Sequence, residues 1–123
     1  MKINRMMTNI CSEKLTESRD FYSKLFDFAI DYDSDWFVHL ISKDKKLELG
    51  IIDINNEIVP KEARKQPTGT YITFVVENVD EVFKIAKANQ YTVVQIPENT
   101  FYGQRRMLLK DPNNYIIDIS SPL

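Results

Sequence analysis

The sequence predicts an α+β fold of two tandem βαβββ repeats. They would form one curved mixed sheet with helices on the outer face and a concave ligand cup. The apolar stripes of two predicted helices overlay as Phe21 on Val82 and Leu25 on Ala86, an offset of 61 residues. Each helix is followed by three runs with strand character. The 123 residues suffice for one domain with its own core, so we expect a single domain over 1–123.

The first repeat is expected over about residues 1–58. A strand in 3–12 precedes a helix that Thr16 can cap, with Glu17 and Asp20 in its first turn, where acidic side chains favour the helix dipole. Asp27 is expected to end this helix. Three strand-like runs follow at 28–33, 36–42 and 47–53, the last two joined by the polar segment 43–46.

A charged connection, about 54–69, contains Pro60, Pro67 and Gly69 and leads to the second repeat at about 70–123. In this repeat Asn78 can cap a helix, and Asn89 can close it in a left-handed conformation. Strands are expected at 71–76, 91–96, 105–109 and 115–120. The repeat therefore has the same element order as the first.

Composition excludes several classes of function. The 16 basic and 18 acidic residues give a net charge of −2, so no basic excess is available for nucleic acid. The single cysteine, Cys11, cannot form an internal disulfide, which fits a reducing compartment. The longest apolar run, 71–76, is far too short to span a membrane, and no secretory signal is visible. We therefore expect a cytoplasmic protein.

Two carboxylates interrupt apolar strands. Glu48 lies between Leu47 and Leu49, and Asp118 lies between Ile117 and Ile119. Because side chains alternate along a strand, both carboxylates should point away from the helices, toward the concave side. They are either ligand-binding groups or solvated surface carboxylates.

Three segments carry a family resemblance. They are SRDFYSKLFDF at 18–28, VVENVDE at 75–81 and KDPNNYIID at 110–118. With the element order they resemble the vicinal oxygen chelate superfamily, which includes glyoxalase I, bleomycin-resistance proteins and extradiol dioxygenases. The segment FYGQRR at 101–106 is similar to one in a metal-poor branch of small bacterial members. The resemblance implies a homodimer, and Asp27, Asn89 and Asn114 stand where the family usually has turn glycines.

The resemblance also implies four metal-ligand positions. These correspond to Met7, Glu48, Tyr71 and Asp118. Only the two carboxylates are good ligands for a hard divalent ion, whereas a thioether and a neutral phenol are poor ones. The lone histidine, His39, falls outside the set and is expected to be a surface or packed residue. We therefore predict no cofactor, with a weak divalent-metal site at Glu48 and Asp118 as the alternative.

Further site candidates are arginines and aromatic residues. Alternation should aim only one of Arg105 and Arg106 into the cup, as a ligand anchor or as a partner for a carboxylate. Aromatic residues, including Phe101, could form a wall for a planar ligand or belong to the core. The predicted ligand-binding residues are Trp36, Glu48, Tyr71, Tyr102, Arg105, Arg106 and Asp118. No catalytic residue is assigned.

These features support three functional hypotheses. The first is a metal-free small-molecule-binding protein that sequesters an antibiotic or metabolite. The second is a lyase or isomerase related to glyoxalase I, which would need the weak metal site at Glu48 and Asp118. The third is a structural or interaction role, favoured if the cup is collapsed and both carboxylates are bonded internally.

Overall fold

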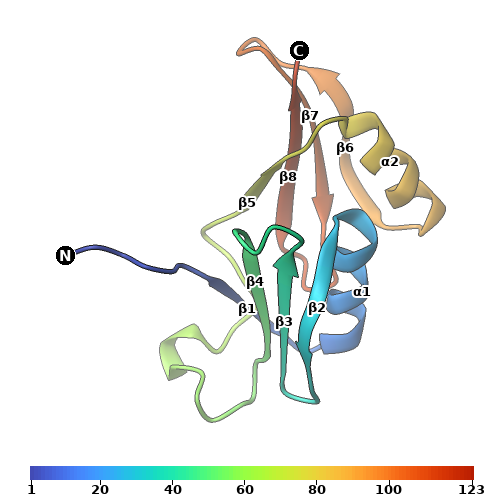
Figure 1. Cartoon of the computed structure of the whole chain (residues 1–123). Coiled ribbons are helices and arrows are strands. Elements are labelled where there is room, and N and C mark those ends of the chain that lie inside the picture. Colours follow the sequence, from blue (N-terminus) through green and yellow to red (C-terminus); the bar gives the residue numbers. More distant parts are fainter. The chain divides into compact units, whose positions relative to one another are not determined.

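The structure is a computed structural model that describes residues 1–123. It divides into two compact units, unit 1 (Met1–Pro67) and unit 2 (Thr68–Leu123), and the boundary falls within the predicted connection. Each unit is a βαβββ repeat with its own four-stranded mixed sheet (Figure 1). The predicted α+β class and the tandem repeat are confirmed. No helix is long and apolar enough to cross a membrane.

Unit 1 has strand order β1-β4-β3-β2. Strand β1 pairs parallel with β4, and the other pairs are antiparallel. A short 3₁₀ helix, η1 (Lys61–Ala63), follows the sheet. The main elements are β1 (Thr8–Ser12), α1 (Leu15–Leu25), β2 (Phe28–Asp33), β3 (Phe37–Ser42) and β4 (Glu48–Asp53).

Helix α1 covers one face of the unit 1 sheet. It contacts β2, β3 and β4 with an apolar stripe that includes the fully buried Phe21 and Tyr22. The sheet residues that share this core occupy every second position of their strands, so burial of their apolar surface fixes which way each strand faces. These buried sheet residues are Ile10, Val38, Leu40, Leu49 and Ile51.

Unit 2 repeats this plan with strand order β5-β8-β7-β6. Strand β5 pairs parallel with β8, and helix α2 contacts β6, β7 and β8. Val79, Val82 and Ala86 of α2 are buried. The elements are β5 (Ile72–Val75), α2 (Val79–Ala88), β6 (Thr92–Asn99), β7 (Gln104–Lys110) and β8 (Ile116–Pro122). The core residues from this sheet are Met107, Leu109, Ile117 and Ile119.

The helix ends differ from several expectations. Thr16 does not cap α1; Lys14 holds the N-cap position without a side-chain hydrogen bond. The helix ends at Leu25, before Asp27, because the next residue is already extended. After α2 the left-handed residue is Gln90, with φ 58°, and not Asn89, with φ −96°.

Two other local predictions are confirmed. Asn114 has φ 60°, as expected at a turn position where the similar family usually has glycine. Asn78 caps α2, because its Oδ1 accepts hydrogen bonds from the backbone amides of Asp80 at 3.0 Å and Glu81 at 3.4 Å. These contacts satisfy two amides that have no partner within the helix.

The two helix starts provide a matched test. Asn78→Ala should lower the free energy of unfolding by about 1 kcal/mol, since it removes a cap that serves two amides. Thr16→Ala should leave the free energy of unfolding unchanged or slightly higher, because alanine is the better helix former. Urea denaturation followed by circular dichroism measures both. An equal loss in the two variants would contradict the capping assignment.

Candidate functional site

Each sheet has one face that its helix does not cover, which we call the helix-free face. In unit 1, Val38 and Leu40 are buried on the α1 side, so His39 between them points to the helix-free face. Glu48 and Gly50 lie on the same face, since Leu49 between them is buried on the α1 side. The prediction that Glu48 points away from the helix is therefore confirmed.

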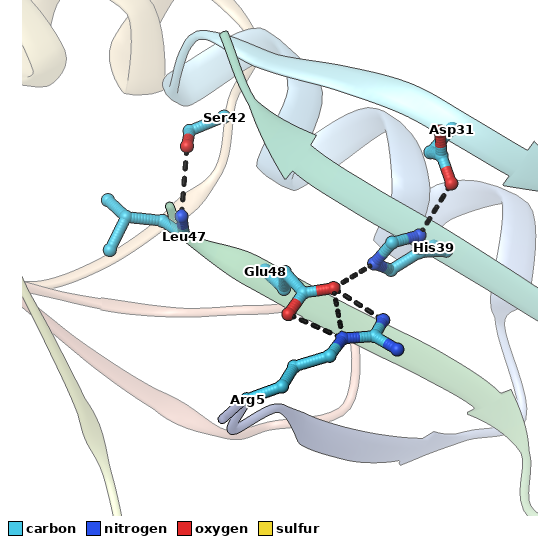
Figure 2. A network of polar contacts seen from close by, with 6 residues as sticks. All are labelled: Arg5, Asp31, His39, Ser42, Leu47 and Glu48. Carbon is cyan, nitrogen blue, oxygen red and sulfur yellow. Dashed lines mark hydrogen bonds and ion pairs between the residues drawn. The ribbon is translucent and has the colours of Figure 1, made fainter. Parts of the chain in front are cut away.

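A four-residue polar network occupies the helix-free face of unit 1 (Figure 2). Arg5 Nε donates to both carboxylate oxygens of Glu48 at 2.8 Å. His39 Nε2 lies 2.9 Å from Glu48 Oε1, and its Nδ1 lies 2.9 Å from Asp31 Oδ2. Because carboxylate oxygens only accept, both imidazole contacts are hydrogen bonds when the ring carries two protons.

A β-bulge brings Asp31 into this network. The register between β2 and β3 shifts between Ile30 and Tyr32, so Asp31 is the extra residue. Bulges redirect a side chain relative to simple alternation, and here the redirected carboxylate contacts His39. His39 was expected to be either a surface or a packed residue, and it is buried. Its two carboxylate partners were not indicated by the sequence.

The network controls the ionisation of Glu48. Hydrogen bonding from Arg5, then from His39, and the positive charge of Arg5 lower the pKa of Glu48 to about 2, although burial acts in the opposite direction. The side chain of Glu48 is only 10% exposed, so its charge depends on these partners and little on water.

Alternation separates the two arginines of unit 2. Met107 is buried on the α2 side, and β7 pairs with β8 without a bulge, so Arg105 points toward α2 and Arg106 points to the helix-free face. Arg105 donates to both carboxylate oxygens of Asp80 in the first turn of α2, at 2.9 and 3.1 Å. Only Arg106 therefore shares a face with Asp118.

Asp118 is 6% exposed and has two partners on neighbouring strands. Arg106 Nε donates to its Oδ1 at 2.9 Å, and Thr73 Oγ1 donates to its Oδ2 at 2.9 Å. The hydrogen bond to Asp118 is the main reason why the pKa of Arg106 is raised. Asp118 thus has the same kind of arrangement as Glu48: a carboxylate on an inner strand, bonded on both sides and neutralised by an arginine.

The predicted aromatic residues come from both units. Trp36 is half-buried in unit 1, with its ring centroid 5.5 Å from that of Phe37. In unit 2, Phe101 and Tyr102 form an edge-to-face pair at 5.2 Å between β6 and β7. Tyr71, just before β5, is 58% exposed. These three unit 2 aromatic side chains are all at least half exposed.

The residues at the family's metal positions do not fit a metal centre. Each unit supplies one carboxylate, and that carboxylate is already paired with arginine. The other two positions, Met7 and Tyr71, offer poor ligands for a hard cation. No group of three or more His, Cys, Asp or Glu side chains is placed to hold a metal ion.

Comparison with known proteins agrees with this fold. The sequence model of the Glyoxalase-like domain family matches residues 6–123. The chain belongs to this family. No curated protein is similar enough in sequence to count as a match.

Solved structures share the fold of this glyoxalase-like protein at low identity. A glyoxalase/bleomycin resistance protein/dioxygenase family enzyme from Burkholderia phytofirmans PsJN has a TM-score of 0.80 at 22% identity, covering 95% of this chain and 97% of the other. TnmS3, an antibiotic binding protein from Streptomyces sp. CB03234, has a TM-score of 0.76 at 19% identity, covering 100% of this chain and 99% of the other. Lactoylglutathione lyase from Agrobacterium tumefaciens has a TM-score of 0.71 at 17% identity, covering 95% of this chain and 92% of the other.

Sequence reasoning missed Arg5, Asp31 and the role of His39. One signal was available for His39. A hairpin closed by 43–46 pairs Ser42 with Leu47 and so places His39 diagonal to Glu48 on the same face. Nothing in the sequence indicates the bulge at Asp31, and Arg5 precedes the first strand.

The ionisation of Glu48 can be tested by removing Arg5. In the wild type, the carboxyl group of Glu48 should have a pKa near 2, reported by the chemical shift of its carboxyl carbon. In Arg5→Ala this pKa should rise toward the usual 4.5. A folded-state pKa below the unfolded value stabilises the fold above pH 4.5, and this stability is lost as pH falls toward 2. Carboxyl NMR titration measures the pKa, and Lys2→Ala is the control. An unchanged pKa in Arg5→Ala would contradict the network.

The two arginines of β7 allow a second comparison. Arg106→Met leaves the shielded Asp118 without its cation and should lower the free energy of unfolding by roughly 2 kcal/mol. Arg105→Met should cost less, because Asp80 is 47% exposed and water replaces the lost partner. Chemical denaturation at neutral pH measures both. A larger loss in Arg105→Met would contradict the assigned faces.

Proposed function

We propose that this glyoxalase-like protein binds a small organic molecule on its helix-free faces without a metal ion. The observation that carries the proposal is the neutralisation of Glu48 by Arg5 and of Asp118 by Arg106. In a metal-dependent site these carboxylates would face a cation from solution. Here each has a permanent cation from its own unit.

Charge balance explains why a divalent ion is disfavoured. To bind Glu48 or Asp118, the ion would have to displace an arginine that donates a charge-assisted hydrogen bond at 2.8–2.9 Å. The displaced guanidinium would then lie beside a divalent cation. This argues against the lyase or isomerase alternative that uses Glu48 and Asp118 as metal ligands.

A purely structural role also predicts internally bonded carboxylates, so other features must decide between these two hypotheses. Unit 2 keeps exposed aromatic rings at Tyr71, Phe101 and Tyr102, and both tyrosines lie near enough to Arg106 to raise its pKa. Arg106 uses only its Nε toward Asp118, and its side chain is 26% exposed. Exposed rings next to unused donors are typical of a ligand surface. A face with only a structural role would be expected to bury them.

The fold neighbours are compatible with sequestration. TnmS3 is an antibiotic binding protein with this fold, and binding that protects by mass action needs no catalytic group. We therefore propose an antibiotic or a metabolite as the ligand. The expected homodimer and cytoplasmic location belong to this proposal.

A ligand screen tests the proposal. Chelator-treated protein is combined with a panel of antibiotics and metabolites, and the melting temperature is measured with and without added Zn²⁺, Ni²⁺ or Mn²⁺. At least one compound should raise the melting temperature equally under all conditions, with native mass spectrometry showing one molecule per chain. Tyr102→Ala should weaken this binding, whereas Phe83→Ala, on α2, should leave it unchanged.

Two results would contradict the proposal. Binding or turnover only in the presence of a divalent ion would favour the metal-dependent lyase or isomerase. Absence of any hit, in a protein that is folded and monodisperse, would favour the structural role.

A further inference from the structure

The side chain of Gln104 has an unsatisfied buried acceptor. Its Oε1 is the one buried side-chain oxygen or nitrogen without a hydrogen-bond partner. The backbone of the same residue is satisfied, since its amide donates to Thr100 Oγ1 and its carbonyl accepts from the amide and hydroxyl of Thr100. A buried acceptor left unpaired costs free energy, so a donor from outside the chain would be favoured once the Gln104 side chain turns toward it.

Gln104 shares the helix-free face of unit 2 with Arg106. The pairing of β7 with β8 runs from Gln104 to Lys110 without a register shift, so residues two apart point to the same side. Their Cβ atoms are therefore roughly 7 Å apart. A single small planar group can reach both side chains.

Arg106 supplies the complementary donors. Its Nε is bonded to Asp118, while neither terminal nitrogen has a partner in the protein. In unit 1, Arg5 uses both Nε and Nη2 toward Glu48, and no buried side-chain acceptor is left without a partner. A residue with an unpaired acceptor, Gln104, and one with free donors, Arg106, thus lie two positions apart on the same face of β7.

We infer that Gln104 and Arg106 together recognise a carbonyl group adjacent to an N–H or O–H, as in a lactam, an amide or a hydroxy-ketone. Gln104 Oε1 accepts the hydrogen bond from the ligand's N–H or O–H, and the terminal nitrogens of Arg106 donate to the ligand's carbonyl. Tyr102, half-exposed and two residues before Gln104, offers its ring to the planar part of the ligand. This inference rests on the proposed function and specifies its ligand class.

A matched pair of probes tests the donor requirement. 2-Quinolone carries an N–H next to its carbonyl, whereas N-methyl-2-quinolone has the same ring system without the donor. Titrations followed by ¹H–¹⁵N NMR should show 2-quinolone binding about tenfold more tightly, with the largest shifts in β7 and β8. Equal affinities, or no binding of either probe at millimolar concentration, would overturn the inference.

Variants assign the preference to Gln104. Gln104→Leu should abolish the preference for 2-quinolone and leave the affinity for the N-methyl compound unchanged. Gln104→Glu, which keeps an acceptor, should retain the preference. The control Gln66→Leu, in the exposed connection before unit 2, should behave as the wild type. Retention of the preference in Gln104→Leu would also overturn the inference.

Folding does not confound this test. Gln104→Leu removes an unsatisfied acceptor, so its melting temperature without ligand should equal or exceed that of the wild type. The outcome is also separable from that of the broader screen. A compound that binds wild type and Gln104→Leu alike contradicts only the Gln104–Arg106 pair, whereas a screen without hits contradicts the proposed function itself.

Discussion

A carboxylate on an inner strand of a sheet must be neutralised where water has little access to it. Glu48 on β4 and Asp118 on β8 have side chains only 10% and 9% exposed, and each accepts hydrogen bonds from both sides. In both cases an arginine supplies the charge. This requirement accounts for the charged and polar side chains around each carboxylate.

The two units meet the requirement differently. In unit 1 the arginine comes from the segment before β1, and the histidine on β3 completes the network with help from a bulge. In unit 2 the arginine lies on β7 itself and uses only one of its nitrogens. Arg5 thus uses two of its nitrogens toward its carboxylate and Arg106 uses one, while unit 2 also carries the unpaired Gln104 Oε1 and exposed aromatic rings.

Sequence periodicity predicted much of this arrangement. The stripes at Phe21 and Val82 identified both helices, and alternation around Glu48 and Asp118 identified the face of each carboxylate. These features are local, because a helix or a strand repeats its side-chain direction at a fixed period. Alternation also implied that only one of the two arginines on β7 would share a face with Asp118.

The remaining features depend on contacts between residues far apart in the sequence. Arg5 reaches Glu48 across 43 positions, and no periodic pattern indicates that contact. The bulge at Asp31 breaks the alternation on which the strand predictions relied. The N-cap of α1 was predicted at Thr16 because threonine is a good capping residue by type, but the N-cap lies two residues earlier, at Lys14.

The most direct test of the central claim is a carboxyl-resolved NMR titration with Mn²⁺, a paramagnetic ion that broadens the resonances of the groups it binds. If Glu48 and Asp118 are neutralised by Arg5 and Arg106, their carboxyl resonances should broaden no more than those of exposed carboxylates such as Glu57 and Glu62. Selective broadening of Glu48 and Asp118 at less than one equivalent of Mn²⁺ would show that the ion displaces the arginines and would contradict a metal-free site.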